Sequence, residues 1–456
     1  MSSTIQKLIK GLNAQTRDNR FKAYPAMFEI TLGHPNQVGA LLEAVMAEWP
    51  RGGTFADDAI SYLPESKFPA LVETALASIK AGGQTNAAES VIAHCSLQYP
   101  QALHPHLDEI LRLRPNGDTY FCAWPWRESG AQHVPTLQEV LQRKDSPDNV
   151  RNLALEALFE TREPAAMRLA IASRSGKGDA GLESRMELAK DPNMKALLSL
   201  LKEHQANFGP TPDGATDNDL LEIGYDCRSE KFHRLYSESA WHLIFNLNYL
   251  NADKQPLHLQ KQHPTWHSAD ASAALLRFGG QGNHLCAVCG GQAHHLLTID
   301  PVAVGLGIKN MKRLVLETCL SCLGWEEGAL FYRHDADGLP TPTAYKGKQV
   351  KPRFPSTPFV ETKVRLSPTP KRWFWQDWAV SNSRQNLHRV GGHPCWVQES
   401  DYLRCPDCGQ LMQFLFQLDS NLPTSAGKEF LWGSGGLGYG FWCDSCHISG
   451  FQYQCT

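Results

Sequence analysis

Cysteines in Cys-x-x-Cys pairs are the residues whose type and spacing most clearly suggest chemistry in this sequence. Four such pairs occur, with 29 residues between the first two and 34 between the last two. Each pair places two sulfur atoms on one tight turn, and two turns together supply four thiolates, the usual ligand set of a tetrahedral zinc ion. The sequence therefore predicts two zinc sites. Their ligands are Cys286, Cys289, Cys319 and Cys322 in the first, and Cys405, Cys408, Cys443 and Cys446 in the second.

The grouping and the role of these cysteines follow from loop length and coordination. Joining neighbouring pairs closes shorter loops and costs less conformational entropy, although the sequence leaves open an interleaved arrangement of 286/289 with 405/408. A catalytic zinc ion keeps an open position, usually beside histidine or carboxylate ligands, whereas four thiolates fill the coordination sphere. We therefore expect two structural ions, no catalytic residues, and a protein that is not an enzyme.

Two histidines, His294 and His295, lie between the first two cysteine pairs. This layout resembles that of HNH nucleases, in which a histidine after a zinc knuckle acts as the base. Those enzymes need a further metal-binding histidine just after the last knuckle, and Leu323 occupies that place here. We therefore prefer a structural zinc ribbon or treble clef and keep an HNH-like nuclease as an alternative.

Composition and charge narrow the class of protein. The chain has 456 residues and a net charge of −3, which argues against a protein that binds polyanions over its whole surface. Residues 1–230 carry about 23 basic and 30 acidic side chains, so this half suits a basic partner or simply has a solvated acidic surface. The N-terminus lacks the apolar core of a signal peptide, and no apolar run is long enough to span a membrane. We expect a cytoplasmic protein with reduced cysteines.

Residues 1–175 are predicted to fold as short helices in pairs. Apolar residues recur at helical spacing, as at Val38, Leu41, Leu42 and Val45, and each such stripe must be covered by a neighbouring helix. The segment 148–158 resembles the second half of a HEAT-type repeat. The matching residues are Val150, Arg151, Ala154, Ala157 and Leu158. An irregular helical bundle is the alternative.

The rest of the chain changes character and divides by composition. We predict a linker with one helix at 176–225, a zinc-knuckle α+β region at 226–336, a Pro-rich basic connector at 337–371 and a β domain at 372–456. The connector could contact nucleic acid through its lysines and arginines, but an extended linker with solvated charges is the preferred interpretation. The predicted fold class is α+β multidomain, with HEAT-like helical repeats followed by β-rich zinc-binding domains.

The segment 372–456 resembles YwqG-like domains, a bacterial family of unknown function. The match lies in four motifs, at 390–398, 405–409, 412–419 and 438–443. In the third motif Phe414, Phe416 and Leu418 alternate with a second set of residues, which favours a half-buried strand. The second set is Gln413, Leu415 and Gln417. The resemblance implies a zinc-binding β domain. Because genes of this family often lie near polymorphic toxin genes, it also implies a role in toxin immunity.

The expected function is an immunity protein that occludes a cognate toxin domain. No P-loop, His-Glu-x-x-His or Gly-x-Ser-x-Gly motif is present, and the Gly-x-Gly-x-x-Gly at 433–438 precedes an aromatic strand rather than a helix. The alternatives are a zinc-ribbon adaptor or a nucleic-acid-binding protein that uses residues 346–372, although nucleic acid is not the favoured partner. The HNH-like nuclease is the third hypothesis.

Overall fold

A computed structural model of the chain separates into two compact units, residues 1–214 and 215–456. The structure describes residues 3–13, 24–60, 63–113, 119–126, 129–161, 224–228, 231–246, 248–252, 275–309, 311–369 and 386–456, with a few single positions between 163 and 257. The linker predicted at 176–225 lies almost entirely outside these residues.

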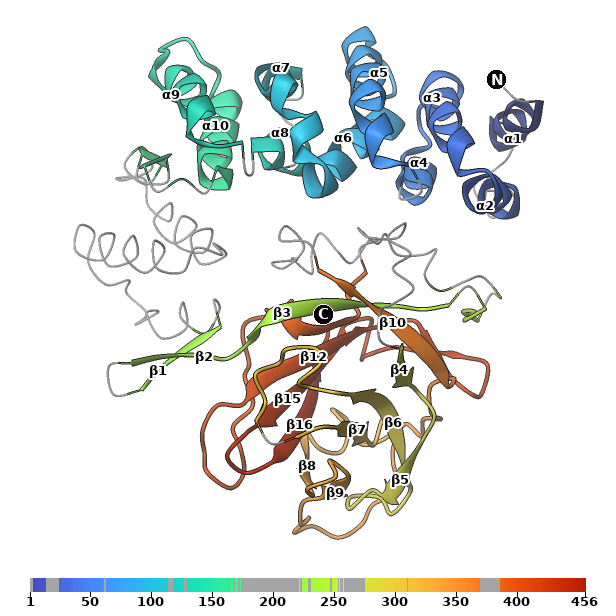
Figure 1. Cartoon of the computed structure of the whole chain (residues 1–456), viewed down its shortest axis with the longest axis vertical. Helices are drawn as coiled ribbons and strands as arrows, with labels where there is room; N and C mark the ends of the chain where they lie inside the picture. The colour runs from blue at the N-terminus through green and yellow to red at the C-terminus, as the bar shows by residue number, and fades with distance from the viewer. Residues whose placement is uncertain are drawn as a thin grey trace. The chain divides into compact units, whose positions relative to one another are not determined.

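The first unit is helical. Its described helices are α1 (Ser3–Asn13), α2 (Tyr24–Gly33), α3 (Val38–Glu48), α4 (Gly53–Ile60), α5 (Phe68–Ala81), α6 (Asn86–Gln98), α7 (Leu107–Leu113), α8 (Thr119–Cys122), α9 (Val134–Gln142) and α10 (Asp148–Glu160). Helices pack mainly on those near them in sequence, α3 on α1, α4 and α5, and α10 on α9 and α7 (Figure 1). The predicted helical half is therefore present, while a HEAT repeat stays a prediction.

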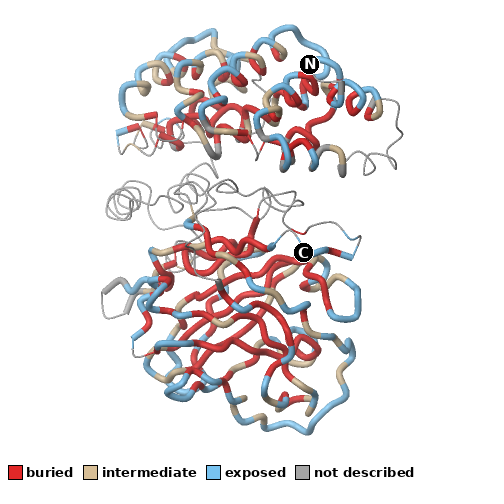
Figure 2. The backbone as a smooth tube through the Cα atoms, turned by 45° about the vertical axis from the view of Figure 1, so that its right-hand side comes forward, coloured by how far each residue is buried: buried red, intermediate tan, exposed pale blue. Residues whose placement is uncertain are grey.

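Apolar stripes hold this unit together. The stripe of α3, Val38, Leu41, Leu42 and Val45, is fully buried, as its spacing predicts. Figure 2 shows buried and exposed segments alternating along the helical unit. Arg151 of α10 donates a hydrogen bond to the Arg143 carbonyl at the end of α9, 3.1 Å away, and this carbonyl also accepts the Ser146 amide at 3.4 Å. The last two helices are thus joined by both packing and a cap.

The second unit is built on one large antiparallel sheet, which confirms the α+β class. Strands run in the order β5-β6-β4-β10-β3-β11-β12-β15-β16-β8-β9, with β7 paired to β6 (Figure 1). The strands of the sheet are β3 (Ser237–Ile244), β4 (Leu275–Phe278), β5 (Gln281–Leu285), β6 (Gln292–Ile299), β7 (Leu314–Thr318), β8 (Leu330–His334), β9 (Pro340–Pro342), β10 (Thr362–Pro368), β11 (Arg389–Gly392), β12 (Gln413–Asp419), β15 (Leu437–Cys443) and β16 (Ile448–Gln454). Two short pairs lie outside it. They are β1 (Tyr225–Arg228) with β2 (Lys231–Arg234), and β13 (Leu422–Pro423) with β14 (Glu429–Phe430).

The sheet curls so that its two ends approach each other. Strands β5 and β7 at one end both contact β9 at the other. The Val315 amide of β7 donates to the Gly338 carbonyl before β9, 3.0 Å away. Gly338 has a φ of 73°, and a Cβ there would lie 1.8 Å from the Arg313 carbonyl, so only glycine permits this closure.

The curled sheet encloses a large apolar core and carries a smaller one on its other side. Strand β12 serves both, since Phe414 belongs to the smaller core and Phe416 and Leu418 to the larger. A register shift between Phe414 and Phe416 changes which face the side chains reach. The predicted half-buried pattern of this strand is therefore wrong, and Gln417 is fully buried.

The boundaries expected inside the second unit differ from the observed arrangement. Strands from 226–336, 337–371 and 372–456 all belong to the one sheet. Strand β10, from the segment expected to be a connector, pairs with both β3 and β4. Composition is a local property, whereas these pairings join residues far apart in the sequence, and that is the physical reason for the difference.

Candidate metal centres

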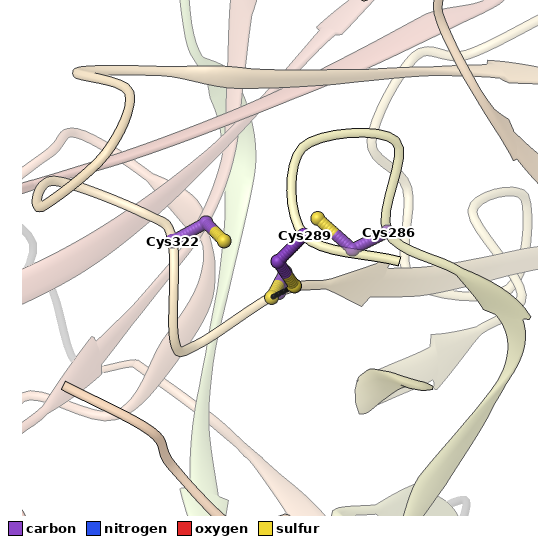
Figure 3. Close-up of side chains that lie close together, drawn as sticks. Cys286, Cys289 and Cys322 are labelled. Carbon is purple, nitrogen blue, oxygen red and sulfur yellow. Dashed lines mark hydrogen bonds between the residues drawn. The ribbon is translucent and has the colours of Figure 1, made fainter. Parts of the chain in front are cut away.

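The first group of four cysteines sits where two hairpin-like segments meet. Cys286 and Cys289 lie in the turn between β5 and β6, and Cys319 and Cys322 follow β7. Strands β6 and β7 are antiparallel partners, with His294 opposite Thr318, so the start of one strand lies beside the end of the other. The pairing therefore brings the two Cys-x-x-Cys turns together. Figure 3 shows three of these side chains pointing toward a common space.

The second group repeats this arrangement. Cys405 and Cys408 lie in a turn before β12, closed by a bridge between Arg404 and Leu411. Cys443 ends β15, and Cys446 lies in the turn to β16. Strands β12 and β15 are antiparallel partners, which again sets the start of one beside the end of the other. Antiparallel strand pairing therefore brings the cysteines together in both groups.

The sulfur atoms of each group are close enough to hold a metal ion. All ligand atoms of a group lie within 4.8 Å of one another, and the groups are the sequential ones, not the interleaved ones. The Cys289 and Cys319 sulfurs are 3.8 Å apart, and those of Cys408 and Cys443 3.7 Å apart. A tetrahedral ion with metal–sulfur bonds of about 2.3 Å has sulfur–sulfur edges of about 3.8 Å. The donor geometry therefore fits such an ion.

Glycines shape the first turn of each group. Gly290 and Gly409 both have a φ of 69°, and their amides donate to the Cys286 and Cys405 carbonyls at 2.8 and 2.9 Å. The next amide, that of Gly291, donates to the Cys289 sulfur at 3.4 Å. A backbone amide aimed at a sulfur atom helps to orient that ligand at a metal site.

The proton balance of the first group shows why a cation suits it. Hydrogen bonds from Cys319 and Cys322 lower the pKa of Cys286 to about 2, while the same contact with Cys286 raises the pKa of Cys319 to about 12. The Cys286 sulfur thus loses its proton easily while Cys319 keeps its proton, because two negative charges this close repel each other. A bound divalent cation favours ionisation of all four.

The two groups differ in burial. Cys286, Cys319 and Cys322 are buried and belong to the large core. In the second group Cys405 and Cys443 are buried, whereas Cys408 is exposed. Four sulfurs complete a tetrahedron in either case, so neither arrangement reserves a position for water or substrate.

The neighbouring histidines are bonded inside the protein. His294 Nδ1 accepts the Leu320 amide at 3.1 Å, so its Nε2 carries the proton and faces the Ser356 carbonyl at 3.2 Å. His295 is fully buried, with its ring nitrogens 2.8 Å from the Gly279 carbonyl and 2.7 Å from the Thr298 hydroxyl. Burial lowers the pKa of both histidines. These rings act as structural connectors in this arrangement.

The sequence did not predict the buried carboxylate that lies beside the first group. Glu317 of β7 is fully buried and accepts the backbone and side-chain amides of Asn283 at 2.8 and 3.1 Å. His284 Nδ1 lies 2.9 Å from its Oε2. Burial alone would raise the pKa of Glu317, but these neighbours outweigh burial and lower it. The one available signal was a charged residue inside the apolar run 314–318.

Strand β8 contacts both groups through adjacent residues. The Tyr332 hydroxyl is buried and accepts the Cys319 amide at 3.2 Å. Arg333 donates to Asp407, which lies between Cys405 and Cys408, at 2.5 Å, and to the Cys446 carbonyl at 3.4 Å. The two centres are therefore joined by one short strand.

Comparisons with known proteins give one match. The chain is 26% identical over 247 residues to a protein of Salmonella typhimurium (strain LT2) described as "Uncharacterized protein YpfL". The match covers 49% of this chain and 50% of that protein, so it spans about half of either. No family model and no solved structure matches. Across the described residues, no helix combines the length and apolar character needed to cross a membrane.

The fold and the cysteine groups together define an α+β protein with a helical unit and two four-cysteine centres in a curled antiparallel sheet.

Proposed function

We propose that this chain is a non-catalytic binding protein in which two structural zinc ions brace the β unit. The observation that carries this proposal is the pair of complete four-sulfur groups with tetrahedral spacing. Zinc is the metal that such a donor set most often holds in proteins, and when bound it closes two distant turns into one rigid corner. The bound ions would fix the ends of the strands that carry or flank these cysteines, which are β5, β6, β7, β12, β15 and β16.

The polar groups nearest the metal centres support a non-catalytic role. In the described part of the chain, neither group contains a histidine or carboxylate ligand that would accompany an open coordination position. Both ring nitrogens of His294 face protein partners, so this ring is not free to act as a nuclease base. This supports a scaffold in preference to the HNH-like alternative.

The partner we propose is a toxin domain, which this chain neutralises by covering it. The proposal depends on the YwqG-like resemblance of residues 372–456 and on the excess of acidic side chains in residues 1–230. An acidic surface suits a basic toxin, and a rigid surface of standard size with a few anchoring side chains is sufficient for stable occlusion. Action in the cytoplasm is part of the same proposal.

Co-expression tests this function. The full chain and the toxin encoded beside its gene are produced together, and cell survival and co-purification are measured. We expect survival and a stable complex, with both lost in a Cys405→Ser/Cys443→Ser variant that removes the second centre. The exposed-loop variant Lys312→Gln is the matched control and should protect fully. Failure to protect and to form a complex would contradict the toxin proposal. Metal-dependent cleavage of nucleic acid that disappears in His294→Ala would contradict the non-catalytic one.

A further inference from the structure

A segment of the chain is fastened across the first metal centre. Residues 345–356, here called the strap, form no strand, but three of their backbone amides donate hydrogen bonds that hold them. The Val350 amide donates to the Val288 carbonyl at 3.0 Å, the Arg353 amide to Glu326 Oε1 at 2.7 Å, and the Ser356 amide to the Ser321 hydroxyl at 2.8 Å. Val288 and Ser321 lie inside the two Cys-x-x-Cys turns. The centre therefore positions the strap.

The strap presents positive charge to solvent. Its four cationic residues are all exposed, and none of them forms an ion pair with another described residue. They are Lys346, Lys348, Lys351 and Arg353. Two carboxylates lie close by, but Glu326 receives the Arg353 amide and Glu327 interacts with the Tyr345 hydroxyl. The cations outnumber these carboxylates, and anions in solution are free to approach them.

Two exposed aromatic rings stand beside this charge. Trp325, just after the second cysteine turn, is 37% exposed, and Phe354 of the strap is 48% exposed. Their ring centroids are 4.4 Å apart, so they make one continuous aromatic surface. Covering these two rings with a ligand would release water and lower the free energy.

We propose that the strap and Trp325 form a binding site for single-stranded nucleic acid. Phosphates meet the four cations, and unpaired bases stack on the Trp325–Phe354 surface. A duplex is disfavoured because its bases are already stacked on each other and offer no face to the rings. The anchored backbone lowers the ordering cost of binding. This site does not depend on the toxin-binding function proposed above, and its test is separate from the co-expression test.

The test uses full-length protein with bound metal and a fluorescein-labelled dT20 oligonucleotide, followed by fluorescence polarisation. We expect saturable binding that weakens with salt, with a slope of log K against log salt near about −3, from four phosphates at about 0.7 each. Changing all four strap cations to glutamine should flatten this slope. The matched control, Lys309→Gln/Lys312→Gln, should leave it unchanged.

The aromatic contribution is separated by a second set of variants. Phe354→Ala should weaken binding about fivefold or more at every salt concentration without changing the slope, and Trp325→Ala should do the same. Val302→Ala, at another exposed apolar residue, is the control. Metal content and thermal unfolding are measured for each variant, since Trp325 follows Cys322 closely. An rU20 oligonucleotide and a dT20·dA20 duplex define the preferred strand type.

Several results would overturn the proposal. One is the absence of saturable binding of dT20 or rU20 at 50 mM salt. Another is equal affinity of the wild type and of the variant in which all four strap cations are changed to glutamine. The third is tighter binding of the duplex than of the single strand. Displacement of the oligonucleotide by polyglutamate at equal charge concentration would instead assign the surface to acidic protein segments.

Discussion

At the scale of residues, His294 connects the first metal centre to the strap. Its ring accepts the Leu320 amide inside one cysteine turn and faces the Ser356 carbonyl on the other side. Groups that support metal ligands without touching the metal typically change metal affinity by about 10–100-fold when removed. The sequence singled out His294 only as the base of an HNH-like nuclease, and its partners come from distant segments that the sequence could not identify.

The His294→Ala variant should bind metal more weakly at the first centre. We expect at least about a tenfold loss in affinity, because the Leu320 amide loses its acceptor and the turn loosens. Competition with a chromophoric zinc chelator measures the change, and Lys312→Gln serves as control. Equal metal affinity in the wild type and in His294→Ala would show that the ring does not support the centre.

His334 of β8 should make stability depend on pH. Burial lowers its pKa to about 4, and its ring faces the Gly338 carbonyl and the Ser449 hydroxyl. The unfolded chain takes up a proton near pH 6.5, whereas the folded chain does so only near pH 4. The free energy of unfolding should therefore fall as pH drops from about 6.5 to about 4, by up to about 3 kcal/mol from this group.

Urea unfolding of the wild type and of His334→Gln between pH 7 and pH 4 measures this effect. Cysteine ligands also take up protons on metal loss, but they do so in both proteins, so the difference between the two curves isolates His334. The variant should show the shallower dependence. Parallel curves would contradict a neutral buried ring at this position.

At the scale of elements, antiparallel pairing decides which cysteine turns meet. Strands β6 and β7 bring the first two turns together, and β12 and β15 bring the last two. The sequence predicted the two groups of four cysteines that the structure brings together, because Cys-x-x-Cys is a local pattern, and loop length favoured the sequential grouping. It could not predict β10 inside the sheet or the buried Glu317, because both depend on contacts between distant segments.

Close packing of β12 on β15 predicts a strong effect at Gly440. A Cβ at this residue would lie 2.2 Å from the Phe416 ring. Gly440→Ala should therefore lower the free energy of unfolding by about 1–3 kcal/mol, since the buried ring must shift. Gly328→Ala is the matched control, because nothing lies within 4 Å of its added Cβ. Urea titration at fixed zinc concentration compares them, and equal stability of the two variants would refute the packing argument.

At the scale of the whole molecule, the two units have separate internal contacts, and both metal centres lie in the second. Removing metal should therefore open the β unit and spare the helical one. After treatment with a strong chelator, we expect limited proteolysis to cut within residues 275–456 while a fragment of about the first unit persists, and the helical circular dichroism signal should remain. Simultaneous loss of both units, or unchanged resistance of the β unit, would contradict independent bracing by metal.

The most direct measurement is the metal content and sulfur coordination of the purified full-length chain. The account predicts two zinc ions per chain by elemental analysis, one of which is lost in Cys286→Ser/Cys319→Ser and the other in Cys405→Ser/Cys443→Ser. It also predicts an X-ray absorption signal of four sulfur neighbours at about 2.3 Å and no light-atom neighbour. Fewer than two ions per chain, or an oxygen or nitrogen atom in the coordination sphere, would contradict the claim that these centres only brace the fold.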